Sequence, residues 1–125
     1  MTLNECVVRV EKRFPGQTDV KEIVAHVTTL EHRIANEALS RYREAKYNRN
    51  FSRYDQDTDG ELTLMAPPPY DEMYVHYVLS QIYLAIHEEE HYNNELEITS
   101  KILADYKVHL IQTMRPDSPS RRRAR

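Results

Sequence analysis

The chain has little glycine and little cysteine. Only 2 of its 125 residues are glycine, and Cys6 is the single cysteine. The shortage of glycine argues against a loop that cradles phosphate, because such loops bind the anion through closely approaching backbone N–H groups. Cys6 has no second cysteine with which to form an internal disulfide, which fits a reducing compartment.

Long apolar runs are also missing. No apolar stretch approaches the roughly 18 residues that a bilayer-spanning helix needs. Glu5 and Arg9 interrupt the apolar residues near the N-terminus, so we expect no signal peptide there. Hydrophobic residues make up 40% of the chain and charged residues 30%. This balance predicts a soluble, helix-rich single domain.

Positive charge is concentrated at one end of the chain, in residues 121–125. The formal net charge is −3, and removing the four arginines within residues 121–125 leaves a body of −7. A duplex-DNA reader is expected to have a basic folded surface, which this body lacks. The tail could contact nucleic acid or an acidic partner, or it could simply solubilise the chain. Its candidate contact residues are Arg121, Arg122, Arg123 and Arg125.

Two amphipathic helices are predicted in the first third of the chain. Thr2 and Glu5 have the spacing of a capping box, and Pro15-Gly16 ends the first helix. Asp19 is positioned to cap a second helix, in which apolar residues recur at spacings of three and four to about Arg43. These patterns predict two helices that each bury one face.

Two more helices are predicted after residue 70. Asp71 is a good N-cap for the third helix, which is apolar almost all round and should therefore be buried on more than one side. We expect some of that surface to meet another subunit. The fourth helix should run from about Glu88 or Tyr92 to Met114. The third and fourth helices could form a hairpin that breaks near His87, or one long kinked helix.

The helical pattern stops between about residues 46 and 69, a segment that we call the arm. Residues 51–54 and 62–64 could be short strands joined across Asp59-Gly60, and residues 67–69, all proline, should be extended. The predicted fold is all-α: a small bundle of about four helices with a long middle arm and a possible short β-hairpin. The domain spans residues 1–115 and a flexible basic tail spans 116–125.

Part of the arm resembles a calcium-binding loop. Asp55, Asp57, Asp59 and Gly60 occupy positions 1, 3, 5 and 6 of an EF-hand loop. Position 12, where the loop needs a bidentate glutamate, is Ala66. We therefore interpret the segment as an acidic turn.

Residues 87–91, with the sequence HEEEH, satisfy the zinc-binding pattern H-E-x-x-H. On a helix, His87 and His91 would share a face, and Glu88 could act as a general base. The motif lacks a third histidine, because Glu97 stands where one would be expected, which leaves Glu97 or Asp105 as the candidates for a third ligand. A small zinc hydrolase is therefore only the alternative function, and we expect no catalytic residue, metal ligand or cofactor.

A second short motif is the Pro-Pro-Pro-Tyr sequence of residues 67–70, which matches segments that WW domains bind as polyproline helices. A monomeric helical adaptor that recruits one partner through this segment is a further alternative. Packing of Tyr70 against the start of the third helix is the simpler interpretation.

The order of several short motifs resembles a family. Residues 64–77 (LMAPPPYDEMYVHY) are followed by Gln81-Ile82 and by residues 92–94 (YNN). Earlier, residues 13–15 (RFP) end the first helix and residues 30–34 (LEHRI) lie in the second. This order is similar to that of small structural proteins encoded among the head genes of tailed bacteriophages. The resemblance covers most of the chain to about residue 114, but not the HEEEH run or the RRRAR tail.

The resemblance implies a head–tail connector, also called an adaptor: a mostly helical, non-enzymatic neck protein of the virion. It implies a ring of about twelve subunits below the portal protein that contacts other neck and tail-completion proteins. Such a ring extends the DNA channel without sequence-specific binding and docks the tail, after assembly in the host cytoplasm and without a membrane. The residues expected at protein interfaces are Phe51, Tyr54, Leu62, Leu64, Pro69, Tyr70, Tyr74 and Tyr77.

Overall fold

The structure is a computed structural model that describes residues 1–16, 18–42, 54 and 58–114. The fold is all-α, as predicted, and these residues form four α-helices and one short 3-10 helix. Over the described ranges it has no β-strand, only an isolated bridge between Thr2 and Thr63. The elements in chain order are α1 (Leu3–Arg13), α2 (Val20–Glu37), η1 (Leu39–Arg41), α3 (Glu72–Ala85) and α4 (Glu89–Thr113).

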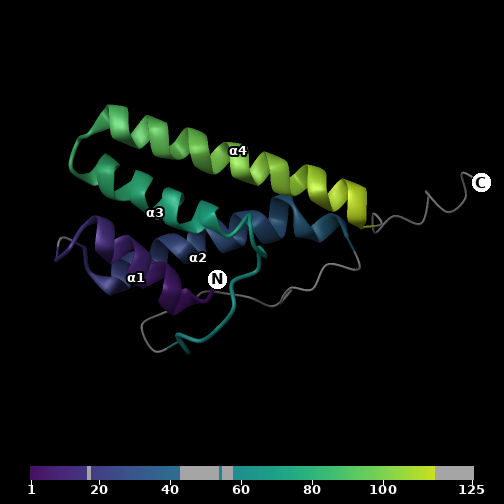
Figure 1. Cartoon of the computed structure of the whole chain (residues 1–125), viewed down its shortest axis with the longest axis horizontal. Helices are drawn as coiled ribbons and strands as arrows, with labels where there is room; N and C mark the ends of the chain where they lie inside the picture. The colour runs from purple at the N-terminus through teal and green to yellow at the C-terminus, as the bar shows by residue number, and fades with distance from the viewer. Residues whose placement is uncertain (17, 43–53, 55–57, 115–125) are drawn as a thin grey trace, which may run out of the picture.

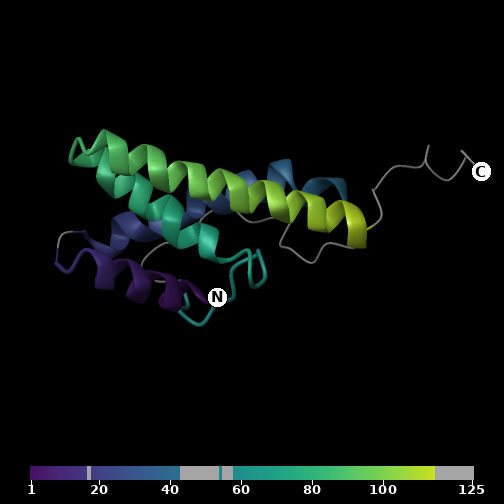
Figure 2. The ribbon, with the colours of Figure 1, turned by 45° about the horizontal axis from the view of Figure 1, so that its top comes forward.

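The helices form layers around α3 (Figure 1). Helix α4 lies along one side of α3, while α1 and α2 lie on the other side, so that α3 contacts all three. The turned view in Figure 2 keeps this order, with α4 still the outer helix. The central position of α3 explains its sequence, because a helix with neighbours on two sides needs apolar residues around most of its circumference.

The predicted start of α1 is confirmed. The Thr2 hydroxyl accepts a hydrogen bond from the Glu5 N–H at 3.2 Å, and the Glu5 carboxylate accepts one from the Thr2 N–H at 3.0 Å. These two bonds satisfy N–H groups that the first helical turn leaves open. The helix ends at Arg13, and Gly16 follows with a φ of 70°, a backbone conformation that suits glycine.

The start of α2 also follows the sequence, since the Asp19 carboxylate caps the helix through the Lys21 N–H. Its end differs from the prediction. The α-helix stops at Glu37 rather than near Arg43, and a single 3-10 turn, η1, takes the chain on to Tyr42. Such tighter turns are common where an α-helix ends.

Asp71 occupies the N-cap position of α3, as predicted, but its side chain makes no capping hydrogen bond. Its carboxylate instead accepts a bond from the Met1 amino group at 2.7 Å, and this ion pair is buried. The N–H groups of Tyr70 and Asp71 both bind the Pro67 carbonyl oxygen. Residues 67–71 are therefore a tight turn, not the extended segment that three prolines suggested.

Helices α3 and α4 form a hairpin, which decides between the two alternatives left by the sequence. The α-helix ends at Ala85 and the next begins at Glu89. Between them His87 has a φ of 62°, in the left-handed region. The chain reverses in this short turn, so α4 packs back along α3 (Figure 1).

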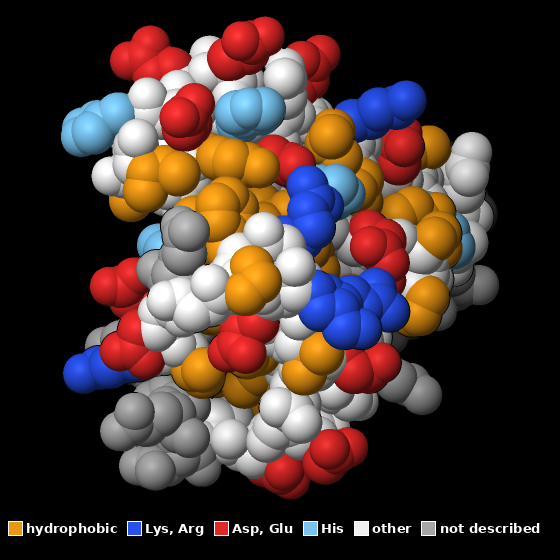
Figure 3. Space-filling view, turned by 60° about the vertical axis from the view of Figure 1, so that its left-hand side comes forward, with side chains coloured by type: hydrophobic (Ala, Val, Ile, Leu, Met, Phe, Trp, Pro, Cys, Tyr) orange, Lys and Arg blue, Asp and Glu red, His pale blue; other side chains and the backbone are white. Residues whose placement is uncertain are grey.

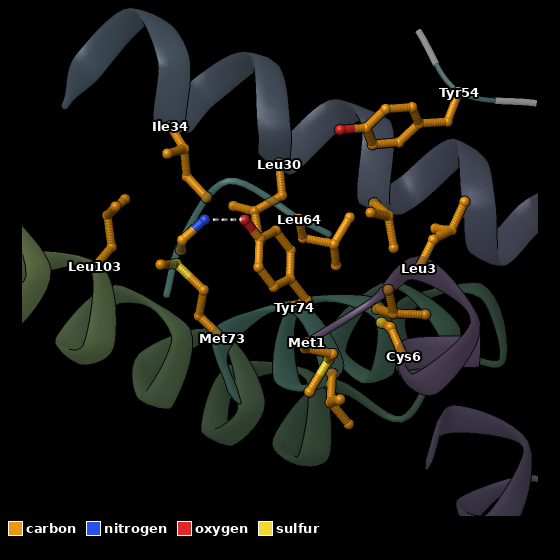
Figure 4. Close-up of a cluster of buried hydrophobic side chains, with 14 of the residues drawn as sticks. Met1, Leu3, Cys6, Leu30, Ile34, Tyr54, Leu64, Met73, Tyr74 and Leu103 are labelled. Carbon is orange, nitrogen blue, oxygen red and sulfur yellow. Dashed lines mark hydrogen bonds between the residues drawn. The ribbon is translucent and has the colours of Figure 1, made fainter. Parts of the chain in front are cut away.

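The hydrophobic core gathers where α1, α2, α3 and the end of the arm meet (Figure 4). Tyr74 is fully buried among Leu30, Leu64 and Met73, and Cys6 lies nearby on α1. The side chains that α3 buries are Met73, Tyr74, Val75, Val78, Leu79, Ser80 and Ile82. Burial of α3 on more than one side, as its sequence predicted, is thus achieved within one chain.

The described end of the arm pairs with the N-terminus. The Leu64 N–H binds the Met1 carbonyl at 3.0 Å, and the Leu3 N–H binds the Leu62 carbonyl at 2.9 Å. Residues 59–62 form the expected turn, closed by a bond from the Leu62 N–H to the Asp59 carbonyl at 3.0 Å. Residues 62–64 therefore pair with residues 1–3. Of the proposed partner strand at residues 51–54, only Tyr54 is among the described residues, and it does not lie in a strand.

Candidate interaction surfaces

Three of the residues expected at an interface are buried inside the chain. Tyr54, Leu64 and Tyr74 all belong to the core cluster, and Tyr74 has no exposed surface. In this conformation they expose at most 9% of their surface to a neighbouring subunit. Their aromatic and aliphatic character reflects packing of the arm on the bundle.

Glu31 explains why two of these residues are tyrosines. Its carboxylate lies buried on α2 and accepts hydrogen bonds from the hydroxyl groups of both Tyr54, at 2.9 Å, and Tyr74. It also accepts one from the Met65 N–H at 3.0 Å. We call these four residues the Glu31 network. It ties the arm at Tyr54 and Met65 to α2 and α3 through one carboxylate.

The electrostatics of the network follow from its burial. Loss of water raises the pKa of Glu31, while hydrogen bonds from Tyr74, Met65 and Tyr54 oppose that rise. Burial and the nearby Glu31 carboxylate raise the pKa of Tyr54 and of Tyr74, so both phenols stay protonated donors. A buried carboxylate with three donors is a fixed polar anchor, because breaking the set leaves unpaired groups in the core.

The remaining described interface candidates retain some exposed surface. Leu62 and Pro69 are exposed, while Tyr70 and Tyr77 are half-buried. The Tyr70 ring packs against Tyr106 at 5.2 Å between ring centroids, and against His109 at 5.3 Å. Tyr70 therefore fastens the start of α3 to α4, as the packing interpretation of the Pro-Pro-Pro-Tyr motif expected.

The remaining candidates, Phe51, Arg121, Arg122, Arg123 and Arg125, lie outside the described residues. The same holds for Asp55 and Asp57 of the calcium-like loop. Of that loop, Asp59 is described, and its carboxylate accepts a bond from the Glu61 N–H at 3.0 Å within the turn. This bond accounts for one acidic residue of the motif as a turn former.

The HEEEH run does not form the geometry of a helical zinc site. His87 lies in the α3–α4 turn and His91 lies in the first turn of α4, so the two do not share one helical face. The His91 ring instead stacks on Tyr83, with 4.8 Å between ring centroids. Over the described part of the chain, no group of three potential ligands is placed to hold a metal ion.

A second polar cluster joins α1, α3 and α4. The Glu95 carboxylate is largely buried and lies 2.6 Å from Nδ1 of His76. Arg13, at the end of α1, reaches the same carboxylate at 3.7 Å. One carboxylate on α4 therefore links α4 to α3 through His76 and to α1 through Arg13.

Exposed apolar side chains concentrate on the α3–α4 hairpin. Among the described residues, eight large hydrophobic side chains are exposed, and five of them belong to the hairpin. Leu84 and Ile86, at 46% and 47% exposed, form what we call the hairpin tip. Figure 3 looks at this end of the bundle and shows hydrophobic side chains at the surface among charged ones. The other three lie along α4: Ile98, Val108 and Ile111.

Sequence reasoning missed Glu31 and the hairpin tip. Glu31 follows Val27 by four residues and precedes Ile34 by three, which places it on the apolar stripe of α2. A charged residue at a position that should be buried was the signal in the sequence that could have identified Glu31. The tip could not be separated from the buried part of α3, because both are apolar in sequence and only the packing tells them apart.

Comparison of the chain with family models, with curated proteins and with solved structures found no match. Within the described residues, no helix is both long enough and apolar enough to cross a membrane.

Proposed function

We propose that this chain is a structural assembly protein of a tailed-bacteriophage particle. In this proposal it forms a ring at the head–tail interface, below the portal, which extends the DNA channel and docks the tail. The order of motifs within residues 13–94 supports the proposal through its resemblance to connector proteins. The proposal concerns binding to other proteins and assigns no reaction to the chain.

The observation that carries the proposal is the uncovered apolar surface of the α3–α4 hairpin. Leu84 and Ile86 are nearly half exposed at the hairpin tip, beside a core that is otherwise well covered. Adjacent exposed apolar side chains of this kind are typical of surfaces that another protein covers. We assign the hairpin tip, with Leu62 and Pro69 of the arm, to contacts within the particle.

The charge of the chain suits a channel wall. Without the four arginines of residues 121–125, the body carries a net charge of −7. Phosphate contacts made by lysine and arginine supply most non-specific DNA affinity, so an acidic wall lets DNA pass without holding it. The arginine tail would then serve a different contact, with an acidic partner or with nucleic acid.

Mixing the chain with the portal protein of its own particle tests the proposal. Light scattering should show a complex much larger than either protein, and electron microscopy should show rings stacked on the portal. Replacing both Leu84 and Ile86 with Asp should abolish binding, because both carboxylates would have to lose water in the contact.

A matched control is Val8→Asp, an exposed apolar residue on α1, which should bind like the parent. Lack of binding by the parent chain, or full binding by the Leu84 and Ile86 double variant, would remove the basis for the proposal.

A further inference from the structure

The outward side of α4 carries a regular row of exposed residues. The helix turns Glu95, Thr99, Leu103, Tyr106 and Leu110 toward the bundle. Across the helix, six exposed residues follow one another at alternating spacings of four and three. This spacing places them in one line, as in the contact positions of a coiled coil. We call this row the α4 seam: Asn94, Ile98, Lys101, Asp105, Val108 and Gln112.

The chemistry of the α4 seam is symmetric about the level of Leu103. Lys101 lies two residues before Leu103 and Asp105 lies two residues after it, and the two have opposite charges. Ile98 lies five residues before Leu103 and Val108 lies five residues after it. Both are apolar, and they are 40% and 51% exposed, respectively. Asn94 lies nine residues before Leu103 and Gln112 lies nine residues after it, and both side chains are carboxamides. The row therefore complements itself when it is reversed.

We propose that the α4 seam is a contact surface for a second copy of this chain, with the two α4 helices antiparallel. A two-fold axis at the level of Leu103 would place Lys101 of each copy opposite Asp105 of the other. The same axis places Ile98 opposite Val108 twice, on either side of the charged centre. A two-fold contact uses the same patch on both copies, which is what a self-complementary row provides.

Charge selects the antiparallel arrangement over the parallel one. In a parallel pair, Lys101 would oppose Lys101 and Asp105 would oppose Asp105, and like charges placed opposite each other oppose association. Outside the seam, Glu97 and His109 are also symmetric about Leu103 and would come together in the antiparallel register.

Helix α4 is free to make this contact on its outer side. In both Figure 1 and Figure 2 it is the outer helix of the bundle, and the described part of the bundle packs against its opposite side. The seam has only two large apolar residues, so the contact is small. Contacts that bury less than about 1,200 Å² in total are weak and transient. The pairing should therefore depend on protein concentration.

This inference does not rest on the proposed function. A two-fold pair closes with two copies, whereas a ring needs two different surfaces on each subunit. The hairpin tip and the α4 seam are separate sets of residues. Self-association is measured on the chain alone, so its failure and failure of portal binding are distinguishable.

Charge exchange across the seam tests the pairing. Sedimentation velocity over a range of concentrations should show the parent chain passing from monomer to dimer. The variants K101E and D105K should each dimerise at least about fivefold more weakly, because each places like charges opposite each other twice. An equimolar mixture of the two variants should dimerise like the parent, since every opposed pair then has opposite charges again.

Cysteine pairs test the register. Under mild oxidation, a mixture of Ile98→Cys and Val108→Cys should form a disulfide-linked heterodimer, while neither variant alone should link to itself. Cys6 should not interfere, because it is fully buried. Linking of Ile98→Cys to itself would indicate a parallel pair and overturn the proposal.

A control on the same helix distinguishes pairing through the seam from nonspecific hydrophobic association. Ile111 is 67% exposed, more than any seam residue with a large apolar side chain, but lies off the seam. Ile111→Lys should leave dimerisation unchanged, whereas Val108→Lys should abolish it. A parent chain that stays monomeric up to about 1 mM, near a binding free energy of only about −4 kcal/mol, would overturn the proposal. Equal losses in the two lysine variants would also overturn it.

Discussion

At the scale of single residues, Glu31 connects segments that lie far apart in the sequence. One buried carboxylate on α2 receives the arm through Tyr54 and Met65, and α3 through Tyr74. A glutamate inside an apolar stripe is usually interpreted as a residue at its margin. The hydroxyl groups that satisfy it come from 23 and 43 residues further along the chain, a distance at which sequence spacing gives no information.

Glu31 should make stability fall as pH rises through the mildly acidic range. Burial raises the pKa of this carboxyl above its value of 4.5 in the unfolded chain, so the folded state binds the proton more tightly. The stabilisation from the protonated form is complete below pH 4.5 and is lost as pH rises through the raised pKa. Glu31→Gln should remove this decline and, by leaving a network donor unpaired, destabilise the protein by about 1–3 kcal/mol at neutral pH.

Urea unfolding of the parent and of Glu31→Gln between pH 4 and pH 8 measures both effects. The difference in unfolding free energy between them should shrink as pH rises. Glu22→Gln, at an exposed position on the same helix, should change stability by no more than about 0.5 kcal/mol at neutral pH. A difference that stays constant with pH would show that the fold does not shift the pKa of Glu31 from its value in the unfolded chain.

Cys6 should be almost unreactive in the folded protein. It has no exposed surface, and burial raises the pKa of its thiol to about 12. Thiol reagents attack the thiolate, which burial both disfavours and shields. Native protein should therefore react with a maleimide or with Ellman's reagent more than about a hundredfold more slowly than protein in urea. Rapid labelling of the folded chain would contradict the packing of α1 against the core.

At the scale of the elements, local signals predicted where α1, α2 and α3 start, but they predicted the capping bond only where its partner is local. Thr2 with Glu5, and Asp19 with Lys21, involve residues two or three apart, and the structure contains both sets of bonds. Asp71 has the same local features, yet its carboxylate binds the Met1 amino group 70 residues away. A buried charge that gains an opposite charge outcompetes a backbone N–H, and no local pattern predicts that competition.

The α3–α4 turn contains a conformational cost that one substitution should relieve. His87 adopts a φ of 62°, where a side chain with a Cβ is disfavoured and glycine is not. His87→Gly should therefore raise the free energy of unfolding by about 0.5–1 kcal/mol, measurable as a higher melting temperature. His91→Gly is the contrasting control, and it should destabilise because it removes a helical residue that stacks on Tyr83. A lower melting temperature for His87→Gly would contradict the turn geometry.

At the scale of the whole molecule, the sequence predicted how much of α3 is buried but not what covers it. An apolar circumference shows that a helix has several neighbours, and it is silent on whether they belong to the same chain. Here α4 covers one side of α3, α1 and α2 cover the other, and the arm reaches α3 through a bond from the Ala66 N–H to the Tyr74 hydroxyl. Two exposed positions, Leu84 and Ile86, are what remains at the tip for another protein.

Asp substitutions along α3 should therefore divide into two classes. Tyr74→Asp should unfold the protein, costing more than about 4 kcal/mol, because it buries a second carboxylate beside Glu31 and removes a hydroxyl donor. Ile82→Asp should be severe for the same reason of burial. Leu84→Asp lies two residues further on but faces water, so its melting temperature should match that of the parent. Circular dichroism and thermal melts of the three variants test this division. A Tyr74→Asp variant that folds but fails to associate would mean that this face of α3 contacts a neighbouring subunit rather than the core of its own chain.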